Sequence, residues 1–241
     1  KKKITPKDDL NNKNQITDIK SQNIYSKMIK IPDSIHFEFH RYLYLIESFL
    51  STTFNHLKNP LLPTNSRIGK KYVVIAPGAN EAFRQWSVQQ FAQLTDYIIS
   101  NFNLTVIISG NQSEEKLGQY ILQESSFKDR IENRCGKTNL IDYCILIQNS
   151  QFIIGNDSSA IHIAAATNTT AICISNGNHF SRFNPYPKEV SQNIHYIYPF
   201  NPNNSYNIYM NKYRTGSKLD INLIKFDEVA KLVNHLAENK L

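Results

Sequence analysis

The sequence predicts an α/β fold built on a parallel β-sheet, and three observations support this prediction. Short apolar runs typical of buried strands occur five times between residues 72 and 175. Stretches with helical periodicity separate them, and strands that alternate with helices of this length form a parallel sheet with right-handed crossovers. Polar or glycine-bearing turns follow the strands, at the sheet edge where such folds bind ligands. The sequence therefore predicts one sheet with one ligand-binding edge.

The predicted elements follow each other in regular order. The strands are expected at 72–76, 104–109, 130–134, 152–154 and 171–175. The helices are expected at 87–99, from 113 onward, at 140–148, at 158–167 and, as a final amphipathic helix, at 226–236. The pattern is lost after residue 175, so the segments 176–187 and 201–218 are expected to be irregular.

The positive charge of the chain is concentrated at its start. Residues 1–30 contain eight Lys and three Asp, so five of the seven net positive charges lie there. We expect a disordered basic leader in this segment, with attraction to an anionic membrane surface as the functional alternative. Nucleic-acid binding is not expected, because it requires basic residues interleaved with aromatic ones on a folded face.

The rest of the chain divides into two parts. Residues 31–70 are expected to form an interdomain helix, with an apolar pattern through Tyr42, Leu45 and Phe49, and a proline-containing linker. Residues 71–241 are expected to form the domain that contains the sheet. There is no run of 18 apolar residues, no signal region follows the first lysines, and the three cysteines lack metal-binding spacing. These features predict a cytoplasmic fragment of a longer protein with free thiols.

The most informative motif follows the fourth predicted strand. Gly155–Asn156 is expected to be a turn, and Asp157, Ser158 and Ser159 are helix-capping residue types before a helix of small residues. His162 lies four residues after Ser158, so both side chains face the same side of the helix. A helix start with unpaired N–H groups at a sheet edge predicts an anion site. The alternative is an ordinary capped helix whose histidine bonds to a backbone carbonyl.

A second motif follows the first strand. The turn Pro77, Gly78, Ala79, Asn80 leads to Arg84, whose guanidinium can bind phosphate oxygens through two N–H groups. The alternative is a surface arginine beside a capping Trp. Two common phosphate motifs are excluded: no Gly-x-Gly-x-x-Gly occurs, and 136–138 ends like a Walker A motif but lacks its upstream glycine.

Together these residues resemble the donor-site signature of glycosyltransferase family 9, the ADP-heptose:lipopolysaccharide heptosyltransferases. That signature reads Asn/Val-Asp-Ser/Thr-Gly-x-x-His-x-x-Ala, and here Ser159 stands where the family has Gly. The resemblance covers about 73–187. It implies a Rossmann-like α/β domain that is the C-terminal, donor-binding half of a GT-B glycosyltransferase. The family's general base, an Asp of the N-terminal domain, has no counterpart here, so the catalytic residue stays unassigned.

The resemblance also implies roles for individual residues. The first turn with Arg84 would contact the donor's diphosphate, and Glu114 would contact the nucleotide, although it could equally complement a helix dipole. The backbone of 136–138 would lie against the adenine, the helix start would bind the diphosphate, Asp157 would reach the donor sugar, and His162 would donate to a phosphate oxygen. The implied donor-binding set is Pro77, Gly78, Ala79, Asn80, Arg84, Glu114, Gly136, Lys137, Thr138, Asp157, Ser158, Ser159, Ala160 and His162. The residues Asn178, His179 and Arg182 are candidates for a loop near the leaving group, or could pack against another domain.

The function that the resemblance implies is transfer of a heptose-like sugar from a nucleoside-diphosphate donor, most simply of the ADP type. The acceptor would be lipopolysaccharide or another cell-surface glycan. Transfer would proceed with inversion and without a metal or other cofactor; no Asp-x-Asp motif occurs. The expected partners are the nucleotide sugar and a glycolipid or oligosaccharide acceptor, with peripheral association at the cytoplasmic face of the inner membrane and no nucleic acid. The alternative is a non-catalytic nucleotide-sugar-binding or scaffolding domain derived from a transferase.

Overall fold

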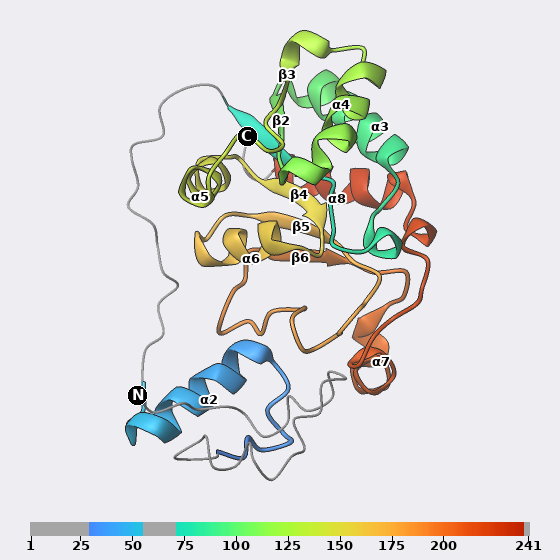
Figure 1. Ribbon diagram of the computed structural model, residues 1–241. Coiled ribbons are helices and arrows are strands. Elements are labelled where there is room, and N and C mark those ends of the chain that lie inside the picture. The colour runs from blue at the N-terminus through green and yellow to red at the C-terminus, as the bar shows by residue number, and fades with distance from the viewer. Residues whose placement is uncertain (1–28, 55–70, 239–241) are drawn as a thin grey trace. The chain divides into compact units, whose positions relative to one another are not determined.

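A computed structural model describes residues 29–54 and 71–238 of the chain (Figure 1). The described residues divide into two units, one formed by 29–54 with 181–183 and the other by the remaining residues. The predicted basic leader and proline-containing linker lie largely outside the described residues.

The larger unit contains a six-stranded parallel sheet (Figure 1). Its strands are β1 (Tyr72–Ala76), β2 (Thr105–Ile108), β3 (Ile131–Asn133), β4 (Ile153–Asn156), β5 (Ala171–Ile174) and β6 (Ile194–Ile197). They lie in the order β3-β2-β1-β4-β5-β6, and every neighbouring pair is parallel. The order reverses between β1 and β4, and folds of this class bind ligands beyond the carboxyl ends of the strands at that point. The predicted Rossmann-like sheet is confirmed.

Helices cover both faces of this sheet, as the alternating side chains of β1 indicate. Val73 and Ile75 pack with α3 (Val88–Phe102), α4 (Glu115–Glu124) and α8 (Phe226–Glu238). Val74 and Ala76 pack with α5 (Leu140–Gln148) and α6 (Ser159–Ala166) on the opposite face. The remaining elements are α7 (Tyr206–Tyr213), η2 (Ala82–Arg84), η3 (Gln112–Glu114), η4 (Lys128–Arg130), η5 (Pro202–Asn204) and η6 (Ile221–Leu223).

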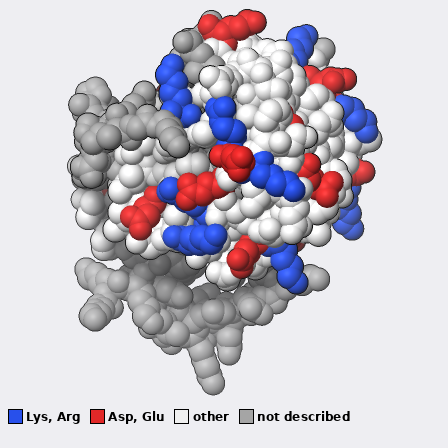
Figure 2. Space-filling view, turned by 90° about the horizontal axis from the view of Figure 1, so that it is seen from above, with Lys and Arg blue, Asp and Glu red and all other residues white. Residues whose placement is uncertain are grey.

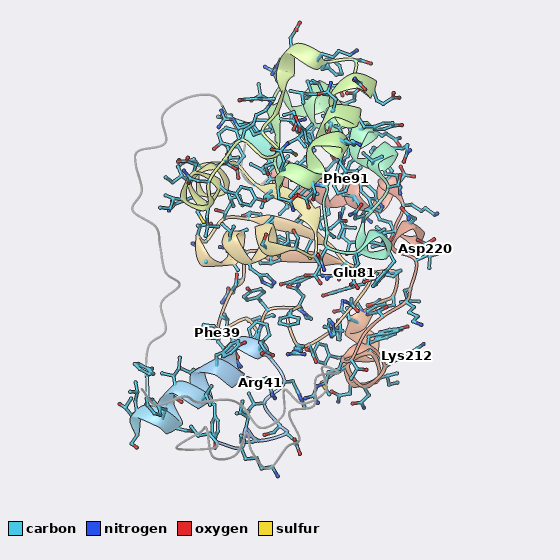
Figure 3. The ribbon with its side chains drawn as sticks, in the orientation of Figure 1. Phe39, Arg41, Glu81, Phe91, Lys212 and Asp220 are labelled. Atoms are coloured by element: carbon cyan, nitrogen blue, oxygen red, sulfur yellow. The ribbon has the colours of Figure 1, made fainter. Side chains whose placement is uncertain are left out.

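The start of α3 shows how the sequence fixes a helix boundary. Ser87 is the N-cap, and its hydroxyl accepts a hydrogen bond from the Gln90 N–H at 3.3 Å. Phe91, labelled in Figure 3, is fully buried and meets the Trp86 ring edge-on at a centroid distance of 5.0 Å. The cap and the aromatic pair together anchor the loop that precedes α3 to the core.

One predicted turn is wrong. Gly155 and Asn156 are the last two residues of β4, where they pair with Cys173 and Ile174 of β5. Gly155 also lies beside Ala76 of β1, and a Cβ atom on it would come within 2.7 Å of the Ala76 carbonyl oxygen. Glycine therefore serves close packing of neighbouring strands here rather than a turn.

Two elements were not predicted, β6 and α7. Strand β6 is an edge strand whose last three residues are only half-buried, so its sequence has no continuous apolar run. Helix α7 lies in a segment predicted to be irregular. Its Tyr209 and Tyr213 stack against Phe200 at centroid distances of 4.3 and 5.3 Å. Aromatic packing against Phe200, which precedes the helix, therefore stabilises α7 although its sequence has only weak helical signals.

The smaller unit contains α2 (Glu38–Leu50), which confirms the helix predicted there. Arg182 donates from Nε to the Glu38 carboxylate at 2.8 Å, and the Arg182 carbonyl accepts from the Glu38 N–H at 2.8 Å. None of the α2 side chains is buried, and Tyr42 and Leu50 are each more than half exposed.

The described surface has mixed charge on the face drawn in Figure 2. Lys and Arg lie interspersed with Asp and Glu there, rather than forming a field of one sign. Such a face does not favour nucleic-acid binding. Among residues 29–54 and 71–238, no helix combines the length and apolar content needed to cross a bilayer.

Candidate functional site

A pocket of about 210 Å³ lies where β1, β2 and β4 end, beside the reversal of strand order. Five of the predicted residues contribute to its wall: Gly78, Glu114, Thr138, Ser158 and Ser159. They come from four separate turns of the chain. The parallel topology brings these turns to one edge, as the sequence predicted.

Glu114 reaches the pocket through a space that two glycines leave open. A Cβ on Gly78 would lie 1.9 Å from its Oε1, and a Cβ on Gly110 would lie 2.2 Å from its Oε2. The carboxylate accepts from the Asn111 N–H at 2.7 Å and so completes a capping box at η3. Glu114 thus caps a helix start and lines the pocket at once, which accommodates both roles considered from the sequence.

The segment 136–138 closes another side of the pocket. Gly136 has φ +71°, which favours glycine, and its N–H donates to the Gly110 carbonyl at 2.9 Å. The Lys137 ammonium donates to the Asn133 carbonyl at 2.8 Å, so it braces the turn from the β3 side. Thr138 lines the pocket directly.

The loop that carries Arg84 is attached to the end of β4 by Asn156. This side chain is fully buried; its Nδ2 donates to the Pro77 carbonyl at 2.6 Å, and its Oδ1 accepts from the Trp86 N–H at 3.0 Å. Sequence reasoning assigned Asn156 to a turn and missed this role. A polar residue at the carboxyl end of a buried strand was the available signal.

The guanidinium of Arg84 does not use all of its N–H groups in hydrogen bonds to the described residues. Its Nη2 donates to the Asp157 carbonyl at 2.7 Å and lies 3.8 Å from the Asp157 carboxylate, while Nη1 lies 4.0 Å from Glu81. Its Nε is buried without a hydrogen-bond partner among the described residues. A guanidinium has five N–H donors, so this one can still bind a ligand anion.

Asp157 is held away from the helix that follows it. Its buried carboxylate accepts from the Ser175 hydroxyl at 3.3 Å and from the Asn184 amide. The N-cap of α6 is Ser158, whose side chain makes no capping bond. The alternative considered from the sequence, a helix capped by the side chain of Asp157 or Ser158, is therefore not observed. Because no side chain caps α6, the N–H groups of its first turn remain suited to an anion.

His162 bonds to a side chain rather than to the backbone carbonyl considered from the sequence. Its Nδ1 lies 2.8 Å from the Tyr186 hydroxyl. Burial lowers the pKa of His162, whereas the negative charge of Asp157 raises it and Arg84 lowers it further. Burial raises the pKa of Asp157 above its ordinary value, against the opposing effects of Arg84 and His162. Asp157, His162 and Arg84 are thus a group of interacting ionisable side chains that takes no part in capping α6.

Asp157→Asn is expected to reduce the pH dependence of stability. The raised pKa of Asp157 means that the folded chain binds more protons than the unfolded one, so ionisation opposes folding. This penalty is absent below the unfolded pKa, about 3.9, and is complete once the pH has risen through the folded pKa. Urea unfolding across a pH series should show wild type losing stability relative to Asp157→Asn as the pH rises.

The control for this series is Asp129→Asn, which removes a carboxylate at an exposed position. If wild type instead gains stability over Asp157→Asn as the pH rises, attraction to Arg84 outweighs burial and the account of this carboxylate is wrong.

The other predicted residues lie elsewhere. Asn178 Oδ1 accepts from the Ser217 N–H at 2.9 Å, and His179 Nδ1 lies 3.2 Å from the Arg214 carbonyl. Arg182 belongs to the smaller unit, where it pairs with Glu38. None of these three lines the pocket. Among the other members of the set, Pro77 supplies a carbonyl to Asn156, Ala79 is buried, Asn80 is exposed, and Ala160 of α6 packs in the core.

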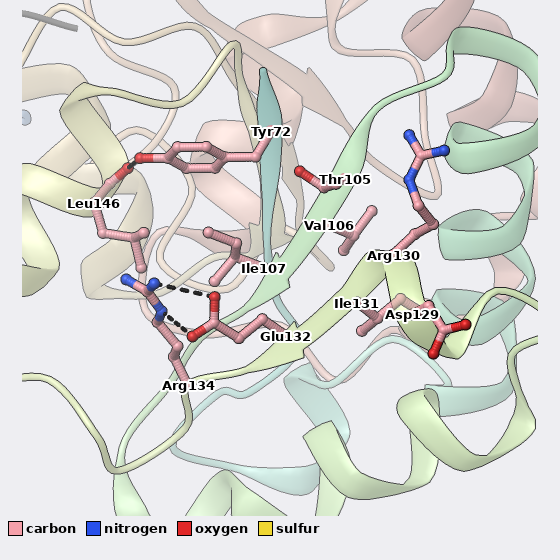
Figure 4. Close-up of a pocket in the computed structure, with 10 residues that line it drawn as sticks. All are labelled: Tyr72, Thr105, Val106, Ile107, Asp129, Arg130, Ile131, Glu132, Arg134 and Leu146. Carbon is pink, nitrogen blue, oxygen red and sulfur yellow. Dashed lines mark hydrogen bonds and ion pairs between the residues drawn. The ribbon is translucent and has the colours of Figure 1, made fainter. Parts of the chain in front are cut away.

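A larger groove of about 330 Å³ lies on the sheet face at the start of β1 and β2 (Figure 4). Its Arg134 is already paired with Glu132 through two contacts, at 2.7 and 3.0 Å. The Tyr72 hydroxyl donates to the Leu146 carbonyl at 2.8 Å. Its polar groups are compensated and it lies away from the strand reversal, so the smaller pocket is the stronger candidate for an anionic ligand.

Comparison with known proteins agrees with this geometry. The family model for glycosyltransferase family 9 (heptosyltransferase) matches residues 38–213. The chain is 27% identical over 165 residues to lipooligosaccharide heptosyltransferase 2 of Campylobacter jejuni, covering 64% of this chain and 51% of that protein. It is 26% identical over 125 residues to lipopolysaccharide heptosyltransferase 3 of Escherichia coli, covering 52% and 37%. The chain thus spans about half the length of the curated relatives it matches first.

Solved structures show the same fold. A glycosyl transferase family 9 protein from Veillonella parvula superposes with a TM-score of 0.71 at 14% identity, covering 90% of this chain and 64% of that one. The E. coli ADP-heptose LPS heptosyltransferase II superposes with a TM-score of 0.70 at 19% identity, covering 90% and 67%. The predicted relation to one part of a GT-B structure is confirmed at the level of the fold.

Proposed function

This chain belongs to glycosyltransferase family 9, and we propose that it binds the nucleoside-diphosphate sugar in a heptosyltransferase-like enzyme. The observation that supports the proposal best is the pocket at the strand reversal, bordered by the uncapped start of α6. Arg84 does not line this pocket, but it donates to the Asp157 carbonyl, one residue before the N-cap of α6, and keeps an unused N–H group. These are the groups that bind a diphosphate in proteins.

In this proposal, a positively charged side chain and the N–H groups at a helix start bind the diphosphate. Arg84 and the first N–H groups of α6 bind its oxygens, and their interaction strengthens as negative charge develops on the departing group. Asp157, held by Ser175 and Asn184, keeps its carboxylate available for sugar hydroxyls rather than for phosphate. The transfer needs no metal in this scheme, and activity is expected to persist in EDTA.

We propose an ADP-type donor and a lipopolysaccharide or other cell-surface glycan as acceptor. The names of the matched relatives, which are heptosyltransferases of lipopolysaccharide and lipooligosaccharide, support this choice. Inversion at the anomeric carbon requires a base that activates the acceptor hydroxyl, and we place that base outside this chain. This chain supplies the donor half of the site.

We further propose peripheral association with the cytoplasmic face of the inner membrane. The positive charge of residues 1–30 and the exposed apolar side chains of α2, among them Tyr42, Ile46 and Leu50, support it. Co-sedimentation with anionic vesicles should decrease as salt is raised and be absent with zwitterionic ones. Equal binding to both vesicle types would contradict this proposal.

Calorimetric titration of the chain with ADP, UDP, GDP and CDP tests the main proposal. Saturable binding of ADP, in preference to the other three, is the expected result. Binding without sugar transfer by the longer protein would favour a nucleotide-sugar-binding scaffold instead. A folded chain that binds none of the four would refute a donor site in this domain.

A further inference from the structure

The hydroxyl of Tyr186 meets His162 on α6, the helix whose first residue borders the proposed donor site. The Oη to Nδ1 distance is 2.8 Å, and the ring centroids are 5.8 Å apart. We propose that Tyr186 is a positioning residue that holds His162 in the tautomer whose proton is on Nε2. The use of that proton, as a hydrogen bond to the diphosphate, rests on the proposed function.

The direction of this hydrogen bond follows from the chemistry of the two groups. A neutral imidazole has one N–H and one nitrogen lone pair, and the bond at one nitrogen decides which nitrogen has the proton. A phenol is a stronger acid than a neutral imidazole N–H, and the imidazole lone pair is more basic than a phenol oxygen. The favoured arrangement is therefore Oη–H donating to Nδ1, which leaves the proton on Nε2.

Both groups are neutral near pH 7, as this arrangement requires. Burial raises the pKa of Tyr186 to about 12, with smaller contributions from Asp157 and Cys173. Burial lowers the pKa of His162, and the charges that act on it oppose one another, since Asp157 raises that pKa and Arg84 lowers it. The hydrogen bond to Tyr186 then decides the tautomer.

Tyr186 is itself held in place by its neighbours. Its backbone N–H donates to the hydroxyl of Tyr196 on β6 at 2.9 Å. Two residues earlier, the Asn184 amide donates to the Asp157 carboxylate. The segment 184–186 thus contacts both ionisable residues of the motif at once. A backbone anchored at both ends can hold a ring in one orientation, which a positioning role needs.

As a consequence, the neutral imidazole of His162 presents one hydrogen-bond donor in a fixed position. Nδ1 is occupied by Tyr186, so Nε2–H is the group that His162 can offer to a phosphate oxygen. The opposite tautomer would present a lone pair to that oxygen and repel it. Tyr186 therefore contributes to diphosphate binding without touching the ligand.

Nitrogen NMR of the imidazole rings in the full chain measures the tautomer directly, with His162→Gln used to assign the signals. The expected result in wild type is an unprotonated Nδ1 and a protonated Nε2. Tyr186→Phe should give a mixture of tautomers. The matched control is Tyr97→Phe, which removes another hydroxyl that donates to a side chain, Asn234 Oδ1, at 2.7 Å. A protonated Nδ1 in wild type, or an unchanged tautomer in Tyr186→Phe, would overturn the proposal.

ADP titration separates positioning from a structural role. Tyr186→Phe should weaken ADP binding about three- to tenfold, the effect of one hydrogen bond. In a His162→Ala background the same change should have no further effect, because its route through the imidazole is gone. An equal loss in both backgrounds would show that Tyr186 acts only on the fold. If the wild-type chain bound no ADP, the proposed function would fail, whereas the tautomer measurement would still decide the role of Tyr186.

Discussion

Arg84→Glu is expected to weaken ADP binding by about a hundredfold or more. The change removes a guanidinium whose charge-assisted bonds to phosphate are each worth roughly 1.5–3 kcal/mol. It also places a carboxylate beside the buried Asp157, whose charge Arg84 offsets at 3.8 Å. Calorimetry measures the effect, and both variants must be titrated at the same salt concentration, because salt screens the interactions of exposed charges.

The matched control is Arg134→Glu, a charge reversal of the same size in the larger groove. Arg134 is paired with Glu132, as Figure 4 shows, and lies outside the pocket at the strand reversal. ADP binding should be unchanged in this variant. Equal weakening by both substitutions would mean that net charge, rather than the position of Arg84, governs binding.

Asn156→Ala is expected to lower the free energy of unfolding by about 2–4 kcal/mol. Two buried backbone groups, the Pro77 carbonyl and the Trp86 N–H, would lose their partner, and each unpaired buried group costs about 1–3 kcal/mol. The loop that carries Arg84 would also lose its attachment to β4. Urea unfolding monitored by tryptophan fluorescence suits this measurement, because Trp86 is the single tryptophan of the chain.

Asn222→Ala provides the comparison for this variant. Ser87, the residue next to Trp86, donates its N–H to Asn222 Oδ1 at 2.9 Å, but Asn222 is only half-buried. Water can replace its bond, so the expected loss is about 1 kcal/mol or less. A loss for Asn156→Ala no larger than this would argue against Asn156 as the attachment of the loop.

The sequence predicted the fold because the buried strands of a parallel sheet are continuous apolar runs. Strand Tyr72–Ala76 was located to the residue for that reason. Helix Leu140–Gln148 was also located to the residue. Gly155 was misassigned because glycine is typical of turns and of close strand packing alike. Strand β6 depends on pairing with β5 and helix α7 on aromatic packing against Phe200, and local periodicity reports neither contact.

The site was predictable where it lies on the turns after strands. Gly78, Glu114 and Ser158 are brought together by topology alone, which the alternation of elements reveals. Asn178 and His179 lie outside the pocket, because the loop after β5 takes its conformation from bonds to the segment 214–217. Tyr186 lies in the same loop and could not be linked to His162 without coordinates.

The most direct test of the donor site is amide NMR mapping of ADP on the nitrogen-labelled chain. A donor site at the strand reversal predicts saturable shifts at the turns that meet there, with Gly78, Gly110 and Ser159 among the most affected residues. Shifts clustered instead around Arg130 and Arg134 would contradict it and place the ligand in the groove of Figure 4.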